Sequence, residues 1–320
     1  MQSTLPRPDY DQELGGVLAG LKFPTNITPE LIPVIRGMPT PAINDTIGEQ
    51  PILHEERSID GPGGPVTLAI FRSTTSQAKG QTHPGLIWFH GGGFFAGSRF
   101  GSIQTQLNLV TDLDVVCISV DYRLGPEHPD PAPREDGYAA LVWVGENLRE
   151  LGIDPARLMI GGSSAGGGLA AGVTLYARDH AGPKLCAQLL QSPMLDDRME
   201  SVSSRQYVNE GTFSRESCFT GWNALLGPRR GGKDVSIYAA PGRAIDLSRL
   251  PPAFIEAGAA ETFRDEIVAY ASLLWAGGSQ AELHVWPGAF HRFQAFAPNA
   301  ALTKIADETR VAWMKRTLSR

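Results

Sequence analysis

A five-residue turn, Gly-Ser-Ser-Ala-Gly at residues 162–166, constrains the fold of this chain more than any other feature. It follows the apolar run 158–160 and precedes small residues that predict a helix over 165–178. Glycine on both sides of Ser164 permits a turn too sharp for neighbouring Cβ atoms. We therefore expect a strand, a tight turn and a helix here, with the Ser164 hydroxyl exposed at the turn.

A glycine loop, His-Gly-Gly-Gly-Phe at residues 90–94, follows a second apolar run at 86–89. Backbone amides preorganised in such a loop stabilise the oxyanion of a tetrahedral intermediate, and the amide after the serine is a further donor. The candidate donors are Gly92, Gly93 and Ala165, with His90 and Gly91 expected to support the loop. Together, the turn and the loop predict acyl-transfer chemistry with Ser164 as nucleophile.

Four motifs carry a family resemblance, and they occur at residues 90–94, 121–129, 162–170 and 287–291. In this order they resemble the hormone-sensitive-lipase-like family of α/β-hydrolase esterases, over about residues 50–315. The resemblance implies an α/β fold, the α/β-hydrolase fold, with a mostly parallel eight-stranded sheet flanked by helices. It also implies a helical cap and the hydrolysis of small esters.

Three positions depart from the usual pattern of this family. Ser163 stands where aspartate most often precedes the nucleophile, and Glu261-Thr262 stands where Asp-Pro is commonest. Arg292 follows the histidine of the last motif where glycine is usual. None of these changes removes a catalytic group, although the second leaves the identity of the acid open.

Apolar runs alternate with helical patterns along most of the chain, as in a parallel sheet with helices on both faces. A hairpin is expected at 52–59 and 66–71. Further strands are expected at 86–89, 115–120, 158–160, 186–191, 253–257 and 283–286. Helices are expected at 103–113, 135–151, 165–178 and 264–276.

Two segments outside this alternation are expected to form a cap over the site. They are residues 1–48 and 195–250, which leave 49–194 and 251–320 as the two parts of the hydrolase core. The second segment is too long for a structureless loop, and Ser214 is placed to begin a helix within it. That helix either packs on the body or covers the active site. Aromatic candidates for a substrate pocket are Phe94, Phe213, Phe219 and Trp222.

The serine needs a base and an acid. His291 lies in a loop after the strand at 283–286, in the order nucleophile, acid, histidine expected for this fold. Glu261, in the loop after the strand at 253–257, is the favoured acid. Asp265, one turn further on, is the alternative and is better placed to support the following helix.

Composition excludes several other classes of protein. The formal net charge of −6 and the lack of a basic cluster argue against nucleic-acid binding. Dispersed histidines and the lack of a phosphate loop or dinucleotide fingerprint predict no metal and no cofactor. Residues 1–8 carry no leader pattern and no run of 18 apolar residues occurs, so no membrane span is expected. Three widely spaced cysteines fit free thiols in the cytoplasm.

The sequence therefore predicts a serine carboxylesterase that acts on short- to medium-chain acyl esters. An amidase or another small-molecule acyl hydrolase is the alternative, because the same triad serves both. A non-catalytic ligand receptor on this scaffold is disfavoured by the presence of His291. The expected partner is a small-molecule ester, and a homodimer is left open.

Overall fold

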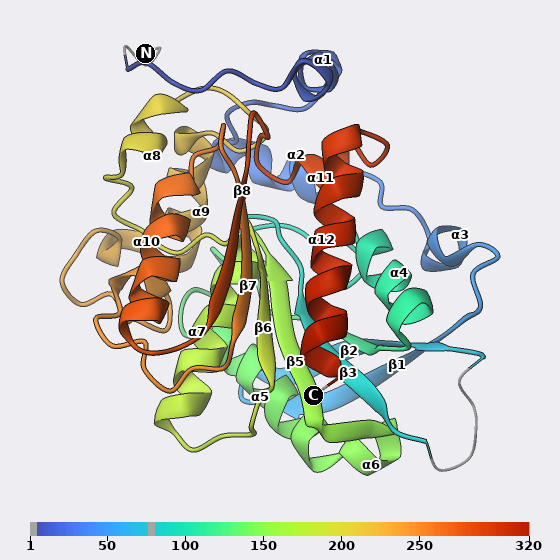
Figure 1. Ribbon diagram of the computed structural model, residues 1–320. Coiled ribbons are helices and arrows are strands. Elements are labelled where there is room, and N and C mark those ends of the chain that lie inside the picture. The colour runs from blue at the N-terminus through green and yellow to red at the C-terminus, as the bar shows by residue number, and fades with distance from the viewer. Residues whose placement is uncertain (1–4, 76–80, 320) are drawn as a thin grey trace.

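One sheet of eight strands runs through the computed structural model, which describes residues 5–75 and 81–319 (Figure 1). The strand order is β1-β2-β4-β3-β5-β6-β7-β8. The strands are β1 (Ile52–Gly61), β2 (Gly64–Ser73), β3 (His83–Phe89), β4 (Val116–Asp121), β5 (Ile153–Ser163), β6 (Ala187–Gln191), β7 (Ala253–Gly258) and β8 (Ala281–Trp286). Among the strands of the described residues, only the pairings β1–β2 and β2–β4 are antiparallel, which confirms the predicted mostly parallel sheet.

The opening hairpin shows how side-chain alternation places the sheet between two cores. Along β2, Val66, Leu68 and Ile70 belong to one buried cluster. Ala69 and Phe71, which alternate with them, belong to the other. Successive strand residues point to opposite faces, so the continuous apolar run at 68–71 is covered on both sides.

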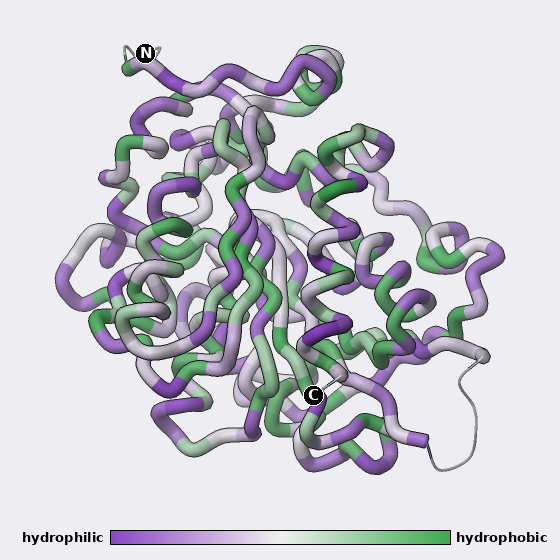
Figure 2. The backbone as a smooth tube through the Cα atoms, viewed as in Figure 1, coloured by the Kyte–Doolittle hydropathy of each residue, from purple (hydrophilic) through white to green (hydrophobic). Residues whose placement is uncertain are grey.

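Helices cover both faces of the sheet (Figure 1). One face carries α5 (Ala132–Glu146), α7 (Ala165–Asp179) and α10 (Arg264–Ala276). The other carries α4 (Gln104–Leu113) and α12 (Ala301–Leu318). Figure 2 shows hydrophobic stretches along the central strands and hydrophilic ones on the peripheral segments. None of the helices in the described ranges combines the length and apolar character needed to cross a bilayer.

Two helical features differ from the sequence expectation. The single helix expected at 135–151 is broken at Asn147, which separates α5 from the short α6 (Leu148–Leu151). The amide side chain of Asn147 donates to the carbonyl of Trp143 at 2.8 Å, a local bond that competes with helix continuation. The long α12 was not expected at all, although it covers one side of the sheet.

The remaining helices are, apart from α9, nine residues or shorter. They are α1 (Gln12–Gly20), α2 (Ile32–Arg36), α3 (Ile43–Ile47), α8 (Val202–Gln206), α9 (Arg215–Leu226) and α11 (Phe293–Phe296), with 3-10 turns at Pro29–Leu31, Gly227–Arg229 and Pro241–Arg243. As expected, the Ser214 hydroxyl caps α9, accepting from the Ser217 amide at 3.3 Å. Of the opening stretch 1–8, residues 1–4 lie outside the described residues.

Hydrogen bonds join the two segments expected to form a cap. The Ile27 amide donates to the Ser217 hydroxyl at 2.8 Å, and the Ser214 hydroxyl donates to the Asn26 side chain at 2.6 Å. Not all of residues 1–48 belong to this joined region, however. Ile47 of α3 packs into the core on the α4 face instead.

A buried ion pair ties α12 to the sheet. The guanidinium of Arg310, 1% exposed, donates to the carboxylate of Glu256 on β7 at 2.7 Å. Glu256 also accepts from Gln191 at the end of β6 and from the Trp286 indole at the end of β8. This network therefore holds together three strand ends that precede the loops of the candidate site.

Replacing Arg310 by methionine should destabilise the protein by about 3–5 kcal/mol, because the Glu256 carboxylate would be left buried without its cation. Chemical denaturation measures this loss. Arg316→Met is the matched control, since Arg316 pairs with Glu282 at the surface and should contribute less than about 1 kcal/mol. Equal denaturation midpoints for the two variants would contradict the assigned role of the buried pair.

Candidate active site

Ser164 lies at the turn between β5 and α7, where the backbone approaches itself so closely that the flanking positions must be glycine. Its φ is 57° and its ψ is −120°. A Cβ atom on Gly162 would lie 2.1 Å from the carbonyl oxygen of Gly166. One on Gly166 would lie 2.1 Å from the carbonyl oxygen of Phe89. Both glycines of the turn are therefore required by sterics, and the serine between them is held in one position.

His291 lies between Ser164 and Glu261, as the sequence predicts. Its Nε2 is 2.9 Å from the Ser164 hydroxyl, and its Nδ1 contacts the Glu261 carboxylate. A carboxylate only accepts, so Nδ1 donates and Nε2 is free to accept the serine proton. All three side chains are buried, at 2–4% exposure. The arrangement can deprotonate the serine and stabilise the resulting imidazolium.

The Glu261 carboxylate is fixed by two further donors at its other oxygen. The Ser192 hydroxyl donates to Oε1 at 3.0 Å and the Gly258 amide donates to it at 2.6 Å. Ser192 follows β6, in a loop to which the sequence analysis assigned no role. No motif marks it, because its contact with Glu261 joins residues far apart in the chain.

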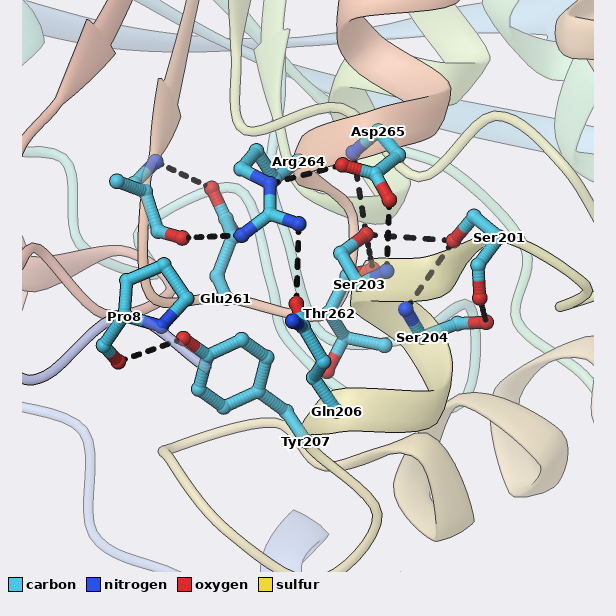
Figure 3. Close-up of polar contacts among 12 residues, drawn as sticks. Pro8, Ser201, Ser203, Ser204, Gln206, Tyr207, Glu261, Thr262, Arg264 and Asp265 are labelled. Atoms are coloured by element: carbon cyan, nitrogen blue, oxygen red, sulfur yellow. Dashed lines mark hydrogen bonds and ion pairs between the residues drawn. The ribbon is translucent and has the colours of Figure 1, made fainter. Parts of the chain in front are cut away.

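Asp265, the alternative acid, contacts a different part of the protein (Figure 3). Its carboxylate accepts from the Ser203 amide in the first turn of α8 at 2.7 Å and from the Arg264 side chain at 2.8 Å. The contact with Ser203 links α10 to α8. Asp265 therefore has the helix-supporting position that the sequence favoured for it.

The glycine loop presents free amides beside the serine. Gly92 and Gly93 have φ of 129° and 62°, and a Cβ on Gly92 would lie 2.0 Å from the Ala96 carbonyl oxygen. Across the described ranges, the amides of Gly92, Gly93 and Ala165 donate to no protein acceptor. Such amides are available to an oxyanion formed on Ser164.

The side chains of His90 and Tyr122 stabilise this loop through hydrogen bonds and ring stacking. The His90 Nδ1 donates to the carbonyl of Gly91 at 2.8 Å, and the ring stacks on Tyr122 with centroids 4.3 Å apart. The Tyr122 hydroxyl donates in turn to the His90 carbonyl at 2.7 Å. Burial lowers the pKa of His90, which favours the neutral form of the ring.

An apolar cavity of about 80 Å³ borders Ser164 and His291. Its large apolar side chains come from segments far apart in the sequence: Phe23, Ile27, Ile35, Phe95, Phe213 and Phe296. A second, open cleft of about 820 Å³ borders the other side of the glycine loop. The site therefore has a small apolar compartment and a larger, more polar one.

Comparison with known proteins identifies the family. The sequence model of a family described as alpha/beta hydrolase fold matches residues 86–295. Esterase LipI of Mycobacterium tuberculosis is 34% identical over 259 residues, 78% of this chain and 78% of LipI. Carboxylesterase NlhH of the same organism is 36% identical over 243 residues, 73% of this chain and 74% of NlhH. The chain belongs to the α/β-hydrolase fold family.

Solved structures agree with this assignment. A bacterial heroin esterase superposes with a TM-score of 0.89 at 34% identity, covering 97% of this chain and 98% of its own. Esterase LipW of Mycobacterium marinum superposes with a TM-score of 0.86 at 30% identity, covering 98% of this chain and 99% of its own. This α/β-hydrolase is a carboxylic-ester hydrolase of the hormone-sensitive-lipase-like group.

Three of the four aromatic pocket candidates lie away from the cavity of this α/β-hydrolase. Only Phe213 borders it. Phe94 has a φ of 65° and packs against Trp222, with ring centroids 5.9 Å apart in the buried core. Phe219 lies between the guanidinium groups of Arg215 and Arg230, each 4.6 Å from its ring. Phe95, next to Phe94 in the chain, lines the cavity, in the role that was expected for Phe94.

Other polar groups of this α/β-hydrolase offer little further chemistry. Within the ranges described, no cluster of three or more His, Cys, Asp or Glu side chains could hold a metal ion. The three cysteines are free, and burial raises the pKa of Cys186 to about 11 and of Cys117 to about 12. These two thiols are therefore protonated and unreactive near neutral pH.

Proposed function

We propose that Ser164, His291 and Glu261 are the catalytic triad of this esterase. The observation that carries the proposal is the hydrogen-bonded line from the Ser164 hydroxyl through the imidazole to the Glu261 carboxylate. His291 takes the serine proton as the oxygen attacks the ester carbonyl carbon. The amides of Gly92, Gly93 and Ala165 then stabilise the tetrahedral oxyanion.

The reaction proceeds through an acyl-enzyme. The imidazolium returns its proton to the alcohol oxygen as the ester C–O bond breaks, which leaves the acyl group on Ser164. A water molecule, deprotonated by His291, attacks the acyl carbonyl and releases the acid. Glu261 stays ionised throughout and holds the imidazole in the tautomer that accepts from serine.

The proposed substrates are esters with short to medium acyl chains. The apolar cavity at Ser164, of about 80 Å³, encloses too little volume for a long acyl chain. Phe23, Ile27 and Ile35 enclose it from the N-terminal segment, and Phe213 encloses it from residues 195–250. These contacts support a cap built from both segments, with the alcohol half of the ester in the open cleft.

Among 4-nitrophenyl esters, turnover should peak at acyl chains of about four to eight carbons and fall for longer ones. Matched 4-nitroanilides should react far more slowly, which separates an esterase from an amidase. The measurement is kcat/KM across both series. Equal or better hydrolysis of a sixteen-carbon ester, with solubility controlled, would show that the acyl compartment is open.

Phe213→Ala should move the chain-length optimum upward, because it enlarges the cavity at Ser164. Phe219→Ala is the matched control, since its ring lies between two arginines outside that cavity. The same ester series measures both variants. A shift in the Phe219 variant, or none in the Phe213 variant, would argue against this cavity as the acyl site.

A cytoplasmic location is also proposed, supported by three free cysteines, because disulfides are rare in reducing compartments. Homodimerisation remains an open expectation of the sequence, which light scattering on the purified protein tests.

A further inference from the structure

Arg292, the residue after His291, places a guanidinium at the active site. Its side chain borders the apolar cavity at Ser164, the open cleft beside the glycine loop, and a void of about 30 Å³ next to Gly91. Within residues 5–75 and 81–319, no carboxylate pairs with its guanidinium, and the groups that interact with it electrostatically are the neutral side chains of Tyr122 and His90. By contrast, the buried Arg310 is held by the carboxylates of Glu256 and Asp307.

The other formal charges at the cleft are paired. Arg36 binds Glu127 at 2.8 Å, Arg123 binds Asp136 at 2.9 Å, and Asp121 binds Arg99 at 2.6 Å. His128 also borders the cleft and adds no negative charge. Among the formal charges that line this cleft, Arg292 is therefore the one without a carboxylate partner in the described residues.

The guanidinium of Arg292 lies close to the nucleophile. The position that a Cβ would take on Gly91 is 3.3 Å from the Arg292 Nη1 and 3.3 Å from the Ser164 Cβ. The Arg292 Nη1 and the Ser164 Cβ are therefore no farther apart than the sum of these two distances. A group a few bonds from an ester carbonyl bound at Ser164 can reach the guanidinium.

The local backbone and the partial burial of Arg292 hold its side chain at the site. Arg292 has a φ of 56°, in the left-handed region that favours glycine, so an arginine here is held against a steric cost. Its side chain is partly buried, and this burial lowers the pKa of the guanidinium. A partly desolvated cation gains most from an anionic ligand that restores its lost interactions.

We propose that Arg292 binds a carboxylate carried by the substrate, so that the preferred esters bear a carboxylate a few bonds from the scissile carbonyl. This inference rests on the proposed triad for the position of that carbonyl. The planar guanidinium offers two parallel N–H donors that match a carboxylate in geometry and charge. The carboxylate can belong to the acyl half or to the alcohol half of the ester, and the two cases are separable by experiment.

The test compares anionic esters with neutral esters of similar length. Monomethyl glutarate against methyl pentanoate places the carboxylate on the acyl side. O-acetylglycolate against propyl acetate places it on the alcohol side. The readout is the ratio of kcat/KM values, anionic over neutral, measured by pH-stat. Arg292→Gln should lower the ratio for one pair by about 10- to 100-fold, the range of a charge-assisted hydrogen bond, and Arg292→Lys should retain part of it.

The double variant Arg36→Gln/Glu127→Gln is the matched control, because it removes a paired arginine of the same cleft without changing the net charge. It should leave the ratios as they are in the wild type. Unchanged ratios in both Arg292 variants, or an equal fall in the control, would overturn the proposal. Hydrolysis of the neutral esters in either case would still leave the proposed triad standing.

A binding measurement tests Arg292 independently of turnover. Calorimetric titration of the Ser164→Ala variant with monomethyl glutarate and with O-acetylglycolate should show binding of one of them. Adding Arg292→Gln should weaken it by about tenfold or more. Equal affinity with and without Arg292, or no binding of either ester to Ser164→Ala, would reject the carboxylate site even if the protein hydrolyses neutral esters.

Discussion

Ser164→Ala should abolish ester turnover, with a fall in kcat of about 10⁶-fold, by analogy with removal of a serine nucleophile from another triad. The acyl-enzyme cannot form without the hydroxyl oxygen. The fold should survive, because the change deletes one buried oxygen whose side-chain partner is His291. Initial rates on a butyrate ester and circular dichroism together measure the two effects.

The neighbouring Ser163 provides the control for this result. Its side chain is also buried, but it is the Ser164 hydroxyl that lies 2.9 Å from the His291 Nε2. Ser163→Ala should therefore still react covalently with an organophosphonate, whereas Ser164→Ala should not. A phosphonate adduct that peptide mass spectrometry maps to Ser163 would refute the assigned nucleophile.

The sequence predicts the turn and the glycine loop well because their requirements are local. Gly162 and Gly166 are needed where the backbone approaches itself within a few residues, and Gly92 is needed where it approaches Ala96. Steric demands of this kind leave a pattern that is readable in a short stretch of sequence. The eight strands follow similarly from apolar runs of appropriate length, and the structure extends most of them by a few residues.

The walls of the site are not predictable in the same way. Phe94 and Phe95 are adjacent phenylalanines that the sequence alone does not distinguish. The positive φ of Phe94 directs its ring to Trp222 and leaves Phe95 at the cavity. Phe23 and Phe296 meet at the same cavity from opposite ends of the chain. Such contacts depend on how the segments pack, which no short sequence pattern encodes.

The same reason explains why α12 and its ion pair were missed. The helix carries Arg310 on its buried side, so its inner face is not uniformly apolar and gives a weak helical pattern. The buried arginine is tolerated only because Glu256 of β7 faces it. That pairing spans a large separation in sequence and becomes visible only in the folded structure.

Glu261→Gln should lower kcat by about 10⁴-fold, comparable to the loss when the triad acid of another serine hydrolase is replaced by its amide. The reason lies in the contacts of the carboxylate. The Ser192 hydroxyl and the Gly258 amide both donate to Oε1, so a glutamine must place its carbonyl oxygen there. Its NH₂ group then faces the Nδ1 of His291, which must accept and so carries its proton on Nε2. In that tautomer the imidazole cannot take the serine proton.

Asp265→Asn is the matched control, because it makes the same chemical change in the adjacent helix. Asp265 accepts from the Ser203 amide and the Arg264 side chain, so its loss should weaken the contact between α8 and α10 and lower stability by about 1 kcal/mol. The kcat of this variant should stay close to the wild-type value, whereas that of Glu261→Gln should fall. If Asp265→Asn were the crippling change with both proteins folded, the acid would be Asp265, and Glu261 would serve only to position the loop after β7.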